Sequence, residues 1–178
     1  MSSEEREFSP GDQYWSLVEP VGDVIDIYQG PEEFARTFDK APRVAGLLFA
    51  AHFCQSEVCN GGFKQFFSNS TGVLAPEAVE GFMAIGQSVL AETVQKACSL
   101  FGEPFPRERL LRQTKLKALD PKLLDALDQR FYDNIDSESG GFATAADSYA
   151  ARTGKSDRTE SGQKTLDAVQ SGTKRRLW

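Results

Sequence analysis

The sequence contains few of the residues that build metal and nucleophilic centres. Its 178 residues include one histidine, His52, and three cysteines, Cys54, Cys59 and Cys98. An odd number of cysteines in apolar helical patterns is typical of buried free thiols, so we expect no disulfide framework. His52, Cys54 and Cys59 are close in sequence, but offsets of two and five residues on one helix do not bring three side chains to one point. The sequence therefore predicts no metal site.

Other motifs of catalysis and membrane insertion are also missing. There is no glycine-rich phosphate loop, nucleophile elbow, Ser-His-Asp set or helical histidine pair, which disfavours a hydrolytic enzyme and predicts no cofactor. No apolar run approaches the roughly eighteen residues that a membrane span requires, so we expect a protein without membrane contact. Residues 1–10 are charged and lack an apolar core segment, which predicts no secretory signal and a cytoplasmic location.

Negative charge is concentrated at the front of the chain. The net charge is −6, and residues 1–40 hold ten acidic but only three basic side chains. An acidic surface disfavours direct binding of nucleic acid and favours basic protein partners, although solubility alone also selects a mild negative charge.

Helical periodicity dominates what remains, and no alternating strand pattern or repeat is found. The sequence predicts an all-α fold: a single compact domain over residues 12–153, with about eight short to moderate helices around a buried central helix. Residues 1–11 are predicted to form a flexible acidic tail, and residues 154–178 a polar, mobile one, because both contain too little apolar surface to order.

The predicted central helix runs from Pro42 to Cys59 and is apolar on nearly every face, which is typical of a buried helix. A later helical pattern begins at Pro76, and Gly86 is expected to bend or break it. A basic helix over residues 107–118 should bury Leu110 and Leu111. The next helix, capped by Asp120, should bury Leu123, and a last helix follows Gly141.

An amphipathic helix is also predicted from Pro20 through Tyr28. In it, Glu19, Asp23 and Asp26 at i, i+4 and i+7 form an acidic row beside an apolar stripe.

The most distinctive stretch is Glu57–Gly72, which reads EVCNGGFKQFFSNSTG. Asn60-Gly61-Gly62 predicts the end of the central helix, with Gly61 in the left-handed conformation. Three aromatic residues then recur at i, i+3 and i+4 on one face of a short helix, which favours core packing over base stacking: Phe63, Phe66 and Phe67.

Polar side chains are interleaved with these aromatics: Glu57, Asn60, Gln65 and Asn69. They can line a polar pocket in which Glu57 acts as a general base. Alternatively, they satisfy helix ends and buried backbone groups around a tight turn, which we favour because buried polar groups need partners in any protein.

The stretch from Glu57 to Ser70 resembles the signature E-V-x-N-G-G-F-x-Q-[YF]-F-x-N-S of a bacterial family of small helical proteins, a domain of unknown function typified by a DNA-mimic protein. Ile85-Gly86 and the segment from Leu127 to Tyr132 also align, so the resemblance covers about residues 35–153. It implies a non-enzymatic protein that binds a basic, DNA-binding partner such as a transcription regulator, and that binds no nucleic acid itself.

Physically, carboxylates three or four residues apart on a helix lie roughly 5 to 6 Å from each other, close enough to imitate a row of phosphates. The acidic row can be extended by α-helical neighbours if the fold brings them together. The partner-binding face predicted in this way comprises Glu19, Asp23, Asp26, Glu32, Glu33, Asp125 and Asp128. The alternative is an ordinary solvated helix face, which is equally compatible with rows this short.

The basic helix over residues 109–117 departs from a uniformly acidic mimic, and it can pair with acidic helices within the fold or across a homodimer. Two other functions stay open. One is a small-molecule-binding or catalytic domain with its polar site at Glu57–Asn69, which an open polar pocket there would favour. The other is an immunity or toxin-neutralising protein.

Overall fold

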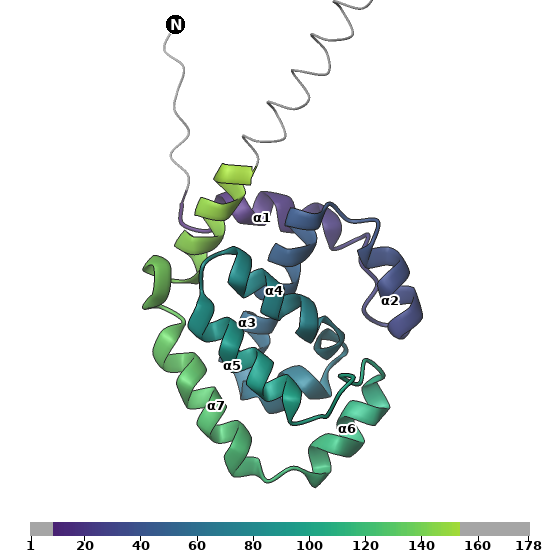
Figure 1. Ribbon diagram of the computed structural model, residues 1–178. Helices are drawn as coiled ribbons and strands as arrows, with labels where there is room; N and C mark the ends of the chain where they lie inside the picture. Colours follow the sequence, from purple (N-terminus) through teal and green to yellow (C-terminus); the bar gives the residue numbers. More distant parts are fainter. Residues whose placement is uncertain (1–8, 154–178) are drawn as a thin grey trace, which may run out of the picture.

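The described part of the chain folds into helices and their connections, and the predicted all-α fold is confirmed. The structure, a computed structural model, describes residues 9–153 (Figure 1). In this range it contains eight α-helices and no β-strand: α1 (Asp12–Val18), α2 (Pro31–Phe38), α3 (Arg43–Ser68), α4 (Ala75–Ala84), α5 (Ser88–Ser99), α6 (Arg109–Ala118), α7 (Pro121–Asn134) and residues 142–153. Three short 3₁₀ helices complete it: η1 (Glu19–Val21), η2 (Ser70–Leu74) and η3 (Glu138–Gly140). Most of the predicted N-terminal tail, and the whole C-terminal one, lie outside the described residues.

The predicted central helix is α3. It begins directly after Pro42, and residues 45–51 are all buried. Helices α1, α4, α6 and α7 all pack against it, and Figure 1 shows the others arranged around it. Its uniformly apolar sequence is therefore explained by burial on every side, because each face meets another helix.

The aromatic residues of the signature stretch form the centre of the core. Phe63, Phe66 and Phe67 are all 0% exposed. The Phe67 ring lies 4.5 Å from that of Phe101 between centroids, and Phe63 meets Phe131 edge-on at 5.7 Å. Such ring pairs stabilise a core beyond their buried area. The prediction of core packing is confirmed.

Helices α4 and α5 form a hairpin against α3. Gly86 stands between them with φ +83°, so the predicted break at this glycine is confirmed. Gly81 sets the distance to α3, because a Cβ atom there would lie 2.5 Å from the carbonyl oxygen of Leu47. The absence of a side chain therefore allows the two backbones to approach closely.

The predicted helix over residues 20–28 is wrong. After η1 the chain turns and continues as a loop to Gly30. The Asp26 carboxylate accepts hydrogen bonds from the backbone N–H groups of Tyr28 (2.7 Å) and Gln29 (3.0 Å), and the N–H of Asp26 donates to the Thr37 hydroxyl. An aspartate that bonds the backbone ahead of it offers the chain an alternative to the helix, and here that alternative wins.

Several burial predictions also fail. Leu110 is 71% exposed, Leu111 46% and Leu123 47%, and Cys59 is exposed, whereas Cys54 and Cys98 are buried. In α6 the fully buried position is taken by Arg112, so Leu110 and Leu111 face outward.

The helix over residues 142–153 closes the domain beside α1, as Figure 1 shows. The Asp147 carboxylate accepts hydrogen bonds from the backbone N–H groups of Gly11 (2.6 Å) and Tyr14 (2.9 Å). A carboxylate at the first turn of α1 favours the helix dipole and satisfies N–H groups that have no partner within the helix. None of the helices in residues 9–153 combines the length and the hydrophobicity needed to cross a bilayer.

Candidate functional site

The signature stretch bends α3 where the sequence places its two glycines. Gly61 has φ −158°, which is extended, and Gly62 has φ +71° and ψ −179°. The left-handed position is therefore Gly62, not Gly61 as predicted. A Cβ atom at Gly62 would also lie 2.3 Å from Oδ2 of Asp128, so backbone conformation and space both require glycine.

Asp128 of α7 caps the second part of α3. Its Oδ1 accepts a hydrogen bond from the backbone N–H of Phe63 at 2.7 Å. Partial burial raises the pKa of this carboxyl above its usual value, and the nearby Asp125 adds to the increase, while the Phe63 hydrogen bond opposes it. Asp128 was predicted to lie on a partner-binding face. It turns into the fold instead, because the kink leaves an N–H group without a helical partner.

Glu57 is the centre of a network of side chains. Its Oε2 accepts hydrogen bonds from Nε2 of Gln65 (2.7 Å) and Nδ2 of Asn69 (2.9 Å), and its Oε1 accepts one from the Thr71 hydroxyl (2.9 Å). Asn60 in turn donates through Nδ2 to Oε1 of Gln65 at 3.1 Å. The four signature polar residues therefore lie together, as the sequence suggested, and Thr71 is a fifth member that it did not reveal.

These side chains were predicted to satisfy helix ends and buried backbone groups. They form hydrogen bonds with one another instead. The network ties the first part of α3 to the second part and to η2. A half-buried carboxylate that accepts three donors has little capacity left for a substrate proton. None of the five cavities described for residues 9–153 is lined by Glu57, Asn60, Gln65 or Asn69.

The helix ends are satisfied from α6. The guanidinium of Arg112 donates to the carbonyl oxygens of Phe67 (3.2 Å) and Asn69 (2.9 Å), and Arg109 donates to that of Ser68 (2.9 Å), as does Gln113. Cations at the last carbonyls of a helix favour its dipole. Arg112 is 0% exposed, and burial lowers its pKa to about 10.

The basic helix is thus used mainly to bind main-chain oxygens. Lys115 donates to the carbonyl oxygen of Phe101 at 2.6 Å, while Arg107, just before α6, forms a two-bond ion pair with Glu77 at 2.7 Å. The basic segment was predicted to pair with acidic helices within the fold. Among the described contacts of Arg107, Arg109, Arg112 and Lys115, only the one between Arg107 and Glu77 is such an ion pair. An arginine in the interior has no clear periodic signal, so sequence reasoning missed Arg112.

His52 lies at the boundary of the core and is half-buried. Its Nδ1 is 3.2 Å from the Tyr14 hydroxyl, and its ring lies 5.0 Å from that of Trp15 between centroids. Burial lowers its pKa. Within residues 9–153, no three His, Cys, Asp or Glu side chains gather in a way that could hold a metal ion.

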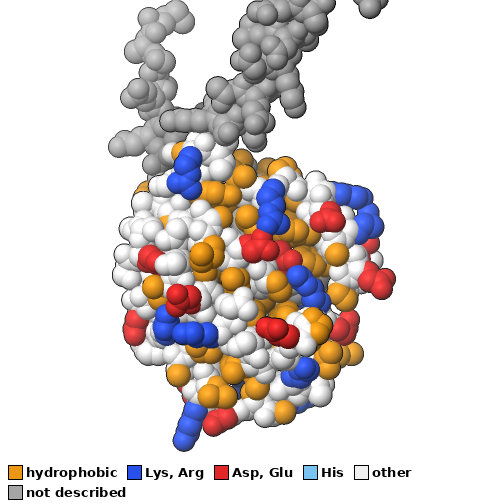
Figure 2. All heavy atoms as spheres, in the orientation of Figure 1, with side chains coloured by type: hydrophobic (Ala, Val, Ile, Leu, Met, Phe, Trp, Pro, Cys, Tyr) orange, Lys and Arg blue, Asp and Glu red, His pale blue; other side chains and the backbone are white. Residues whose placement is uncertain are grey.

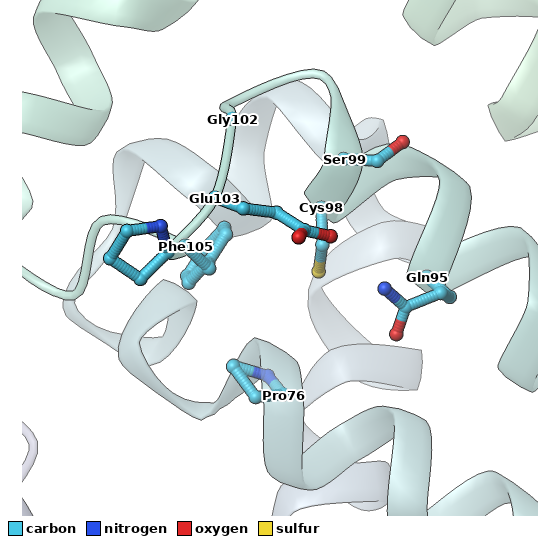
Figure 3. A pocket seen from close by; sticks show the side chains of 8 residues that line it. Pro76, Gln95, Cys98, Ser99, Gly102, Glu103 and Phe105 are labelled. Carbon is cyan, nitrogen blue, oxygen red and sulfur yellow. The ribbon is translucent and has the colours of Figure 1, made fainter.

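One cavity of about 290 Å³ contains a cysteine. It lies between α5, the loop that follows it and the start of α4, and in Figure 3 the sulfur of Cys98 points toward it beside Glu103. Burial raises the pKa of the Cys98 thiol to about 12. A thiol that stays protonated is a poor nucleophile, so burial disfavours Cys98 as a catalytic nucleophile.

The predicted acidic face is divided. Glu19, Asp23 and Glu32 are exposed, and their carboxylates form no hydrogen bond or ion pair with another described residue. Asp26 is engaged in its loop, and hydrogen bonds from the backbone N–H groups of Tyr28 and Gln29 lower its pKa. Glu33 accepts a hydrogen bond from Nε of Arg36 at 2.8 Å, and this bond lowers the pKa of Glu33.

The two acidic segments are not brought together. In Figure 1, α2 and α7 lie on opposite sides of the molecule, so Asp125 and Asp128 do not extend the row formed near α2. Figure 2 shows one face, on which acidic and basic side chains are interspersed. Within the predicted face, the free carboxylates that lie close in sequence are therefore Glu19, Asp23 and Glu32, from η1 to the first turn of α2, whereas the exposed Asp125 belongs to α7.

A comparison with protein families decides the relationship of the chain. The family model described as DMP19-like protein matches residues 39–153, which is more than half of the chain. This protein belongs to the DMP19-like family. The match includes the Glu57 network, Arg112 and Asp128, whereas Glu19, Asp23 and Glu32 precede it. No curated protein and no solved structure matches the chain significantly.

Proposed function

We propose that this member of the DMP19-like family is a non-enzymatic DNA mimic, which covers the DNA-binding surface of a basic protein such as a transcription regulator. Family membership carries the proposal, because the DMP19 family is one of DNA-mimic proteins. The partner is then recognised by charge: its lysines and arginines, arranged to meet phosphates, meet carboxylates instead.

The proposed contact surface is formed by residues 19–32, which we call the acidic segment between η1 and α2. Its free carboxylates are those of Glu19, Asp23 and Glu32. Each is exposed, so it can reach the basic groups of a partner, and none is neutralised by a described neighbour. The segment consists of a short 3₁₀ helix, a loop and the start of α2, so its carboxylates are not arranged on one face of a single helix. Charge complementarity of this kind mainly raises the association rate and selects the partner.

The alternative of a catalytic or small-molecule site at Glu57–Asn69 has less support. An open polar pocket would favour it, but these side chains are turned toward one another, as the 2.7 Å bond from Gln65 to Glu57 illustrates. An immunity or toxin-neutralising protein is compatible with the same acidic surface. It differs in one measurable respect, since its partner need not bind DNA.

Affinity capture from the native cell extract, followed by competition with duplex DNA, tests the proposal. We expect duplex DNA to displace the captured protein and added salt to weaken it, since exposed charge pairs are screened over roughly 8 to 10 Å at physiological ionic strength. The triple variant Glu19→Gln, Asp23→Asn, Glu32→Gln should bind about tenfold more weakly, mostly through slower association.

The matched control removes three exposed carboxylates elsewhere, in Glu103→Gln, Glu108→Gln, Asp136→Asn. It should bind as the parent does, and denaturant melts should show that both triples are folded. A partner that duplex DNA cannot displace, or equal loss in both triples, contradicts mimicry by this segment. The first of these results favours the immunity interpretation instead.

A further inference from the structure

A groove at the α6–α7 corner, on the side that faces the second part of α3, is not used by the proposed function. It encloses about 510 Å³, the largest volume among the cavities described for residues 9–153. Its apolar walls are formed by Leu116, Leu119 and Leu124, of which the first two are half-buried. We refer to it as the α6–α7 groove. Volumes of about 300 to 1,000 Å³ are usual for binding sites.

One exposed leucine, Leu110, lies in line with the groove on α6. Leu110 lies three residues before Gln113 and seven before Lys117, so all three share one face of α6, and Gln113 and Lys117 line the groove. Leu110 is 71% exposed. An exposed leucine in line with a groove extends the site along the helix, which suits an elongated occupant better than a compact ligand.

Two lysines edge the groove, Lys64 from α3 and Lys117 from α6. Both are exposed, and neither ammonium group forms an ion pair or hydrogen bond with another described residue. Three acidic residues adjoin the groove from the side of α7: Asp120 caps the helix through the Lys122 N–H group, Asp128 is held by the Phe63 N–H group, and Asp125 is exposed. The edge that α3 and α6 contribute is therefore positive beside an apolar floor.

We propose that the α6–α7 groove binds an amphipathic helix of a partner protein, whose apolar residues enter the groove while its carboxylates meet Lys64 and Lys117. A helix that binds in a groove inserts apolar residues of its own at i, i+3 or i+4 and i+7, so carboxylates on its flanks can reach the two lysines while its apolar face meets Leu116, Leu119 and Leu124. This surface is separate from the acidic segment between η1 and α2, so the inference does not depend on the proposed function.

Charge argues against two other occupants. A symmetric contact with a second copy places the same patch on both sides, so that the lysines of one copy would approach those of the other. The C-terminal sequence of this chain ends in Lys174-Arg175-Arg176-Leu177-Trp178, which has the same sign as the groove edge. Unlike a second copy or the C-terminal sequence, an acidic helix carries the charge opposite to that of Lys64 and Lys117.

Two designed helical peptides with the same leucine spacing test the proposal, one with glutamates and one with lysines at the flanking positions. Fluorescence anisotropy with the full chain should show binding of the glutamate peptide and at least about tenfold weaker binding of the lysine peptide. In Lys64→Glu, Lys117→Glu the order of the two peptides should reverse. The matched control Lys40→Glu, Lys96→Glu changes two exposed lysines elsewhere and should leave the order unchanged.

The methyl chemical shifts of Leu116 and Leu124 should change when the glutamate peptide is added, which would locate the peptide in the groove. Leu110→Asn should lower the affinity for this peptide. Equal affinities for both peptides, or an order that the double charge reversal does not change, would overturn the proposal. So would a concentration-dependent dimer that Leu110→Asn dissociates, because the occupant would then be a second copy.

Discussion

The carboxylate of Asp128 accepts a hydrogen bond from the backbone N–H of Phe63 at 2.7 Å, and this contact joins α7 to the kink of α3. The kink leaves the first N–H group of the following helical turns without a partner in its own helix. A side chain 65 positions later in the sequence supplies that partner. Local glycine chemistry and a distant helix therefore define the same turn.

Replacing Asp128 by alanine should lower the free energy of unfolding by about 1 to 3 kcal/mol, because a buried donor then lacks its acceptor. Asp128→Asn keeps an acceptor oxygen, and since burial raises the pKa of the carboxyl, the charge itself brings no stability. We expect the asparagine variant to be close to the parent in denaturant melts. If both variants lose the same stability, the hydrogen bond to Phe63 is not the reason for it.

The two glycines of the kink should respond differently. Gly62→Ala places a side chain at φ +71° and 2.3 Å from Oδ2 of Asp128, so we expect a loss of at least about 1 to 2 kcal/mol. At Gly61 the backbone is extended, and a Cβ atom would meet mainly the flexible end of Gln65, at 2.2 Å from Oε1. Gly61→Ala should therefore lower the free energy of unfolding by less than Gly62→Ala does. The loss would arise because the Gln65 side chain moves away and its hydrogen bonds weaken.

Asp128→Ala in the Gly62→Ala background separates the two causes. Removal of the carboxylate relieves the crowding but not the backbone strain and also removes the bond to Phe63, so the double variant should lose less stability than the sum of the two single losses. Chemical denaturation of the four proteins measures this coupling directly. A Gly62→Ala variant as stable as the parent would contradict the account of the kink.

Glu57 distinguishes structure from catalysis. Glu57→Ala should lower the free energy of unfolding by roughly 2 to 3 kcal/mol, since three donors lose their acceptor at once. The effects of Glu57→Ala and Asn69→Ala should be clearly non-additive, because the two side chains share a hydrogen bond of 2.9 Å. A Glu57→Ala protein with an unchanged melting curve and a lost ligand or turnover would restore the pocket hypothesis.

The sequence predicted the structure well where the hydrophobic periodicity agrees with the positions of glycine, proline and capping residues. The apolar run after Pro42, the break at Gly86 and the aspartate cap before Pro121 predict helix boundaries that the structure shows. The helix end predicted at Asn60-Gly61-Gly62 is a kink within α3, and its positive φ falls on Gly62 rather than on Gly61. In each case the cause is local. A residue restricts its own backbone or that of its immediate neighbours, and such restrictions can be read without knowing the fold.

Prediction failed where the partner is distant in sequence. The stripe of Val21, Val24, Ile25 and Tyr28 is compatible with a helix, yet Asp26 and Thr37 together hold a loop there. Arg112 is charged and still fully buried, because its guanidinium meets the carbonyls that end α3 some forty residues earlier. Leu110 is exposed for the same reason, since α6 turns its arginine inward.

Acidification should destabilise the protein through His52, its single histidine. Burial lowers the pKa of His52 in the folded state below its value of about 6.5 in the unfolded chain. Above that pH both states hold a neutral imidazole, so the residue has no effect. As the pH falls through about 6.5, the unfolded state takes up the proton first, and stability decreases by up to about 1.4 kcal/mol per pH unit until the folded-state pKa is reached.

Denaturant melts between about pH 7 and pH 5 test this, because most carboxyl groups titrate lower. In His52→Phe the aromatic contacts with Trp15 and Phe53 can persist, whereas the proton site is gone, so stability should vary much less over this range. The Tyr14 hydroxyl then loses its neighbour at 3.2 Å, and some stability should be lost equally at every pH. The difference in slope between the two proteins, rather than in their stability at one pH, measures the effect. If the slopes are equal, His52 is as free to take up a proton in the folded state as in the unfolded chain, and the pH dependence has another source.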